Sequence, residues 1–100
     1  MKTLANIFYR LRTGFVKIDE VSSIKRLGRD EYQYCENKRC VKLQIEMLTG
    51  PINRLIYAST IKMWEPPHEM EPISLQEKMR IAEIVKRHFE AGGIKTVIEE

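Results

Sequence analysis

The stretch VKLQIEM, residues 41–47, decides the fold. Its odd-numbered residues are apolar and its even-numbered residues are polar or charged. This period of two places one set of side chains on each face of a β-strand. An antiparallel strand of this kind has one face in a core and the other in water. The chain is therefore expected to contain a sheet with one face covered by another element.

Further β-rich segments lie on both sides of this strand. Those that precede it are 15–18, 21–27 and 32–35, with a break at Gly28 and a two-residue turn at Asn37-Lys38. After it, residues 54–64 return as a β-rich run that we expect to pair with 41–47. Pro66 and Pro67 then end the sheet, because proline lacks the backbone donor that a ladder needs.

A capping box predicts that a helix begins after Ser74. The Ser74 hydroxyl can accept a hydrogen bond from the Glu77 N–H, and the Glu77 carboxylate can accept one from the Ser74 N–H. A stripe at helical spacing follows, made of Ile81, Ile84, Val85, His88 and Phe89. Gly92-Gly93 ends the helix, with Gly92 suited to the left-handed position, and 94–98 predicts a last strand.

These elements predict one α+β domain over residues 1–100. We expect an antiparallel β-meander of about four to six strands, packed against one long C-terminal amphipathic helix and followed by a final strand. Residues 1–14 fit either a first strand or a short helix. We find neither an export signal nor an apolar run long enough for a membrane helix, so we expect a cytoplasmic protein.

The distribution of charge does not favour nucleic acid as a partner. Residues 1–50 carry ten Lys and Arg against six Asp and Glu, a net +4, whereas residues 51–100 carry seven against eight, a net −1. The cations are interspersed with carboxylates, which favours solvated strand faces over a nucleic-acid surface.

Cys35 and Cys40 would face each other across the Asn37-Lys38 turn, where the geometry allows a bridge. We nevertheless expect free thiols, because a cytosolic protein keeps cysteines reduced.

The residues for catalysis are missing from the sequence. Neither histidine sits in a nucleophile–base motif, since His68 follows two prolines and His88 lies on the apolar stripe of the helix. Phosphate-binding, acyl-transfer and zinc motifs are absent as well. We therefore predict that the protein is not an enzyme, with no catalytic residues, metal, cofactor or small-molecule substrate.

The connection from Trp64 to Ile73, WEPPHEMEPI, stands out. It holds the only Trp of the chain, three prolines, and three carboxylates against no Lys or Arg. Prolines stiffen a loop before a partner arrives, and such charges repel each other until a positive surface relieves them. We therefore predict a partner-binding surface, and its residues are Trp64, Glu65, His68, Glu69 and Glu71. Two interpretations of Trp64 remain open, namely an interface residue or a plug beneath the helix.

From Gly28-Arg29 onward the sequence resembles the small α+β immunity proteins of bacterial polymorphic-toxin and contact-dependent growth-inhibition systems. The resemblance extends over 28–99. It rests on Gly28-Arg29, the Tyr34 strand, the Glu46 to Gly50 turn, Ile61 to Trp64, Trp64-Glu65-x-Pro67, Ser74-x-x-Glu77, Ile81 and Ile84.

This resemblance implies a non-enzymatic protein that binds one cognate toxin domain, commonly a nuclease, and blocks it. A nuclease binds polyanions, so we infer that the carboxylates of the loop meet its basic cleft. The alternative is a small nucleic-acid-binding or regulatory module, with Tyr9, Tyr32, Tyr34 and the basic N-terminal half as a stacking and phosphate surface.

Overall fold

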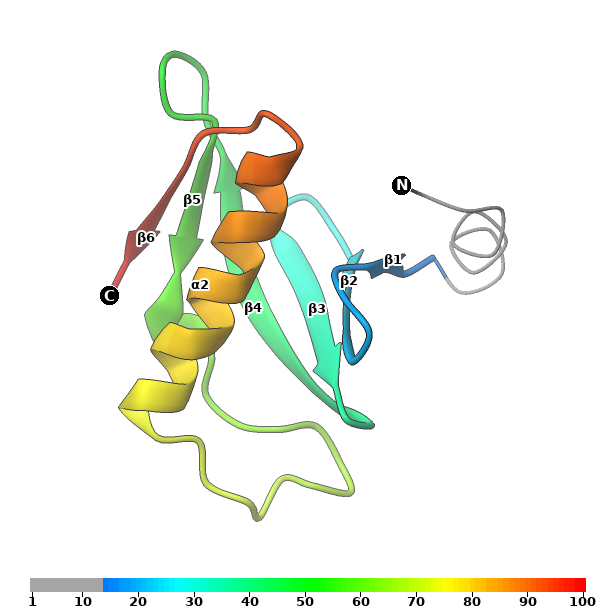
Figure 1. Cartoon of the computed structure of the whole chain (residues 1–100). Coiled ribbons are helices and arrows are strands. Elements are labelled where there is room, and N and C mark those ends of the chain that lie inside the picture. Colours follow the sequence, from blue (N-terminus) through cyan, green and yellow to red (C-terminus); the bar gives the residue numbers. More distant parts are fainter. Residues whose placement is uncertain (1–13) are drawn as a thin grey trace.

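The computed structural model describes residues 14–100 and contains one six-stranded sheet in the order β1-β2-β3-β4-β5-β6 (Figure 1). The strands are β1 (Val16–Lys17), β2 (Ser22–Arg26), β3 (Glu31–Glu36), β4 (Arg39–Met47), β5 (Arg54–Tyr57) and β6 (Thr96–Glu99). A 3₁₀ turn, η1 (Ala58–Thr60), follows β5, and the long helix α2 spans Leu75–Ala91. The predicted α+β fold is confirmed. The segment 1–14, apart from Gly14, lies outside the described residues.

The sheet is mixed rather than wholly antiparallel. Strands β1 to β5 form an antiparallel meander, whereas β6 pairs with β5 in parallel. The parallel pair follows from the crossover, because α2 carries the chain back along the sheet before β6 begins. The predicted pairing of 41–47 with the 54–64 run is confirmed by the register of Ile45 with Ile56. That strand ends at Tyr57, however, earlier than the sequence pattern suggested.

The β3–β4 hairpin has the predicted two-residue turn. Asn37 and Lys38 have φ values of 48° and 66°, the left-handed conformation that this kind of turn requires. Cys35 and Cys40 are direct cross-strand partners, and their Sγ atoms form a disulfide. The expectation of free thiols is therefore wrong for this structure. The turn places the two residues directly opposite each other across the ladder, the arrangement in which a bridge can form.

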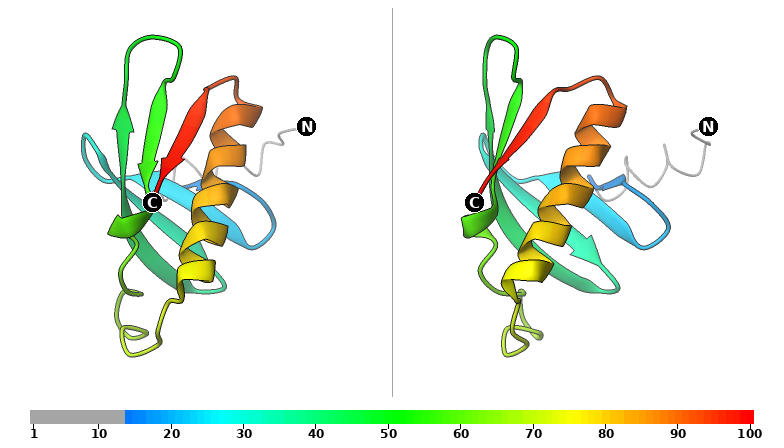
Figure 2. Two further views of the ribbon diagram at one scale, coloured as in Figure 1. Left: turned by 90° about the vertical axis from the view of Figure 1, so that its left-hand side faces the viewer. Right: turned by 60° about the vertical axis from the view of Figure 1, so that its left-hand side comes forward.

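The core lies between one face of the sheet and α2 (Figure 2). On β4 the alternation is as expected, with Val41, Leu43 and Ile45 buried and Lys42 and Gln44 exposed. From α2, the buried side chains are Ile81, Ala82, Val85 and Phe89. The other face of the sheet has no long helix on it within the described part of the chain.

Both ends of α2 are capped, and one cap differs from the expectation. Ser74 Oγ accepts a hydrogen bond from the Glu77 N–H at 3.1 Å, so the predicted start is confirmed. At the other end it is Gly93, with φ 84°, that takes the left-handed conformation, whereas Gly92 has φ −90°. The Ile94 N–H then bonds the Phe89 carbonyl at 3.0 Å, the longer reach of a Schellman cap. The helix therefore ends one residue later than predicted.

Candidate functional site

The proline-rich segment forms a loop, residues 61–74, at one end of the molecule, opposite the β4–β5 loop (Figure 1). It contains a cis peptide bond between Pro66 and Pro67. Two tight turns shape it, because the His68 N–H bonds the Glu65 carbonyl at 2.9 Å and the Glu71 N–H bonds the His68 carbonyl at 3.0 Å. The loop therefore has a defined path held by its own backbone.

Trp64 is the buried anchor of this loop. Its side chain has no exposed surface, and its backbone forms a single antiparallel bridge with Val41. The next residue continues the contact, because the Glu65 N–H bonds the Cys40 carbonyl at 2.8 Å. The indole Nε1–H is buried without an acceptor among residues 14–100, so packing holds the ring. Of the two interpretations, the burial of Trp64 in the same core as the α2 residues therefore favours the plug beneath the helix over an interface residue.

Arg39 joins the loop to the β3–β4 hairpin. Its guanidinium carbon lies 4.3 Å from the centre of the Trp64 ring, within cation–π range. Its Nη1 donates to Glu71 Oε1 at 2.8 Å, and the other oxygen of Glu71 lies 2.6 Å from His68 Nδ1. The hydrogen bond from His68, followed by the one from Arg39, lowers the pKa of Glu71. Glu71 is thus ionised and held on both sides.

These contacts correct the picture of a loop free of cations. No Lys or Arg lies between residues 65 and 73, but the fold places Arg39 against Glu71 from 32 residues away in sequence. Glu65 also has a partner, since its Oε2 accepts a hydrogen bond from Gln33 Nε2 at 2.8 Å. Glu69 has no hydrogen-bond or ion-pair partner within residues 14–100. Among the three predicted carboxylates, Glu69 is therefore the most available to a partner.

Behind the loop, Glu36 is a buried carboxylate with three polar neighbours. Its side chain is 6% exposed, and Arg80 of α2 approaches it with two hydrogen bonds at 3.0 and 2.8 Å. The Tyr34 hydroxyl donates a third at 2.7 Å, and Arg39 lies 3.9 Å away. The bonds from Arg80 lower the pKa of Glu36 despite its burial. This network joins the β3–β4 hairpin to α2 and gives Arg39 a second nearby carboxylate.

The sequence analysis missed an apolar component of this end of the molecule. Met70 is 88% exposed, Leu75 70% and Met63 59%, the three highest values among the large hydrophobic residues described. All three flank or lie within the loop. The signal available in the sequence was weak, because a single methionine or leucine in a polar context carries no prediction of its exposure.

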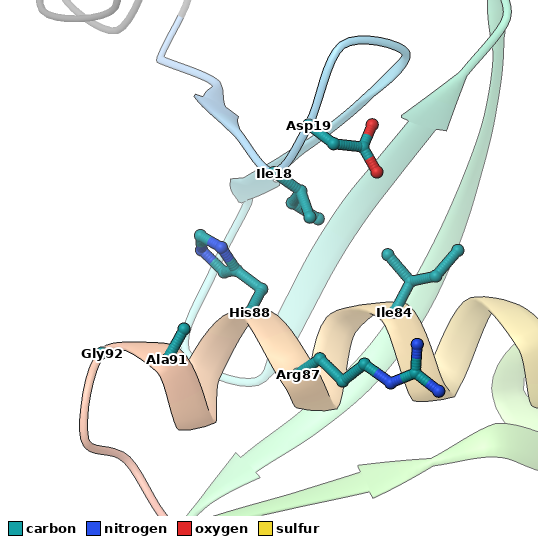
Figure 3. Close-up of a pocket in the computed structure, with 7 residues that line it drawn as sticks. All are labelled: Ile18, Asp19, Ile84, Arg87, His88, Ala91 and Gly92. Carbon is teal, nitrogen blue, oxygen red and sulfur yellow. The ribbon is translucent and has the colours of Figure 1, made fainter. Parts of the chain in front are cut away.

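A concave surface lies at the C-terminal half of α2, away from the loop (Figure 3). It is a pocket of about 450 Å³ between the β1–β2 turn and the last turns of the helix, lined by Ile18, Asp19, Ile84, Arg87, His88, Ala91 and Gly92. The Asp19 carboxylate accepts bonds from Ser22 and from the Val21 N–H, so it is already used by the turn. His88 is half-buried and its ring lies 5.8 Å from that of Phe89, as expected for a packing residue.

Two of the three tyrosines that the base-stacking alternative needs are buried. Tyr34 is fully buried and Tyr32 is 8% exposed, so both rings belong to the core; Tyr9 lies outside the described residues. No group of three or more metal-binding side chains occurs within residues 14–100. In the same part of the chain, the helices are too short or too polar to cross a membrane.

Comparison with known proteins identifies a family. The family model described as immunity protein 74 matches residues 26–99. This range covers β3 to β6, the loop and α2, and it agrees with the resemblance that begins at Gly28. No curated protein and no solved structure gives a significant match.

Proposed function

The chain belongs to the immunity protein 74 family, and on that premise we propose that it binds a cognate toxin domain and blocks its activity, without catalysing a reaction itself. The match over 26–99 carries this proposal. We further propose that the protein acts in the cytoplasm of a bacterium with a polymorphic-toxin or contact-dependent growth-inhibition system.

We propose that the loop 61–74 is the toxin-binding surface. Glu65, Glu69 and Glu71 supply its negative charge, and Trp64 and His68 support it from within. The loop is held by Arg39 and by its own turns before any partner arrives, which lowers the cost of ordering on binding. A toxin that acts on nucleic acid has a basic cleft, and carboxylates placed opposite such a cleft accelerate association. A nuclease is therefore the toxin class that this surface fits best.

The test uses the toxin domain encoded beside the gene of this protein. We expect a stable complex, protection of cells that express the toxin, and loss of the toxin's activity on addition of this protein. In the variant Glu65→Gln with Glu69→Gln, association should slow and become less sensitive to salt, because charge steers the encounter. Glu71 is left intact, since it also holds the loop through Arg39 and His68.

The matched control is Glu83→Gln with Glu90→Gln on α2. It removes the same charge from a helix surface away from the loop, so its association rate should stay close to that of the parent. If both double variants slow association equally, net charge rather than the loop is responsible. If the parent protein neither binds nor protects, the proposed function is wrong.

A further inference from the structure

The loop end of the molecule exposes more apolar surface than folding explains. Met70, Leu75 and Met63, which we call the apolar set, are 88%, 70% and 59% exposed. Their side chains add little to the core at these exposures. The remaining exposed large hydrophobic residues of the described chain lie in other loops, at the end of β4 and in β6. Three of the eight exposed large hydrophobic residues of the described chain thus fall within residues 63–75. Exposed apolar side chains that the core does not use are typical of a protein-interaction site.

The neighbours of Met70 indicate what kind of surface it fits. Met70 lies between Glu69 and Glu71 in sequence, within the turn closed by the bond from the Glu71 N–H to the His68 carbonyl. A partner that buries Met70 therefore brings its own atoms against carboxylates as well. Glu71 is already paired with Arg39 and His68, but a neutral or acidic surface would desolvate Glu69 without compensation, whereas Lys or Arg would pair with it.

We propose that Met63, Met70 and Leu75 are apolar anchors of the toxin complex, and that the part of the toxin that covers Met70 is an apolar depression bordered by Lys or Arg. The proposal rests on the proposed function and adds to it the chemistry of the partner's surface. Methionine suits this role because its unbranched, polarisable side chain adapts to an irregular pocket. The carboxylates would then govern how fast the complex forms, and the apolar set how long it lasts.

The experiment compares single substitutions at exposed hydrophobic positions inside and outside the apolar set. Met70→Ser, Met63→Ser and Leu75→Ser test the apolar set. Met47→Ser and Ile52→Ser are the controls, because Met47 is 40% exposed at the end of β4 and Ile52 is 36% exposed in the β4–β5 loop, at the opposite end of the molecule from the loop 61–74. Dissociation rates are measured against the purified toxin domain encoded beside the gene, and thermal denaturation checks that each variant is folded.

Burial of one such side chain corresponds to roughly a tenfold to hundredfold change in affinity. We expect Met70→Ser to accelerate dissociation by about tenfold or more, with smaller effects at Met63 and Leu75. The two controls should stay within about twofold of the parent, the effect of a position outside the contact. If the parent binds and all three test variants dissociate like the controls, the apolar set is not in the interface. If the parent does not bind, the proposed function fails and this inference with it.

Discussion

Replacing Arg39 by Met should release the loop 61–74 while leaving the sheet and α2 folded. Met keeps most of the apolar stem but removes the guanidinium that lies over the buried Trp64 ring at 4.3 Å and bonds Glu71. A cation–π contact with a desolvated ring contributes about 1 to 2 kcal/mol. The ion pair with Glu71 is left out of this figure, because solvent screens an exposed pair. The loop should therefore open roughly 5 to 30 times more often.

Amide hydrogen exchange measures this opening directly. The Glu65 N–H bonds the Cys40 carbonyl at 2.8 Å only while the loop is seated, whereas the Ile45 N–H bonds the Asp30 carbonyl within the sheet region. In Arg39→Met, we expect exchange at Glu65 to accelerate by roughly 5- to 30-fold, with little change at Ile45. Trp64 is the only tryptophan of the chain, so its fluorescence should shift in parallel.

Two further variants make the result interpretable. Arg39→Lys restores the charge but not the planar stacking group, so it should lie between the parent and Arg39→Met. Arg87→Met is the control, because Arg87 is 76% exposed and its pairing with Glu83 spans 3.9 Å on the helix surface. An unchanged exchange rate at the Glu65 amide of Arg39→Met would falsify the view that Arg39 holds the loop.

Three other predictions concern stability. Glu36→Gln should lower the free energy of unfolding by about 2 kcal/mol, because Arg80 loses its buried partner but remains partly solvated. Arg80 holds the pKa of Glu36 below its ordinary value of 4.5, so the parent should keep this stabilisation above about pH 4.5 and lose it as the pH falls through the folded-state pKa. In urea titrations at successive pH values, the stability of Glu36→Gln should therefore fall less steeply with acid than that of the parent. Ser74→Ala should cost about 1 kcal/mol through the lost cap; an unchanged denaturation midpoint would contradict the assigned start of α2. When the protein is unfolded without reductant, Cys35 and Cys40 should not react with a thiol-alkylating reagent; two alkylations would show free thiols instead. The double variant Cys35→Ser with Cys40→Ser should have a free energy of unfolding about 2 kcal/mol lower, because the bridge closes a small loop.

Features governed by neighbouring residues were predictable from the sequence. The alternation in 41–47 placed Val41, Leu43 and Ile45 in the core, and the Ser74-x-x-Glu77 pattern placed the start of α2. The Asn37-Lys38 turn followed from Asn37, because asparagine tolerates the left-handed backbone conformation, which Lys38 adopts here as well. Each of these depends on side chains a few positions apart, whose relative geometry the helix or strand period sets before any tertiary contact forms.

The candidate site depended on contacts that no local pattern contains. The sequence marked the loop by its carboxylates and prolines, but only the tertiary structure placed Arg39 over Trp64 and against Glu71, and only it left Met70 in solvent. The burial of Trp64 likewise required the chain after η1 to return to Val41 as a single bridge. A sequence period states which face a side chain lies on; it does not state which distant segment covers that face, because that choice is made by the packing of the whole chain around one core.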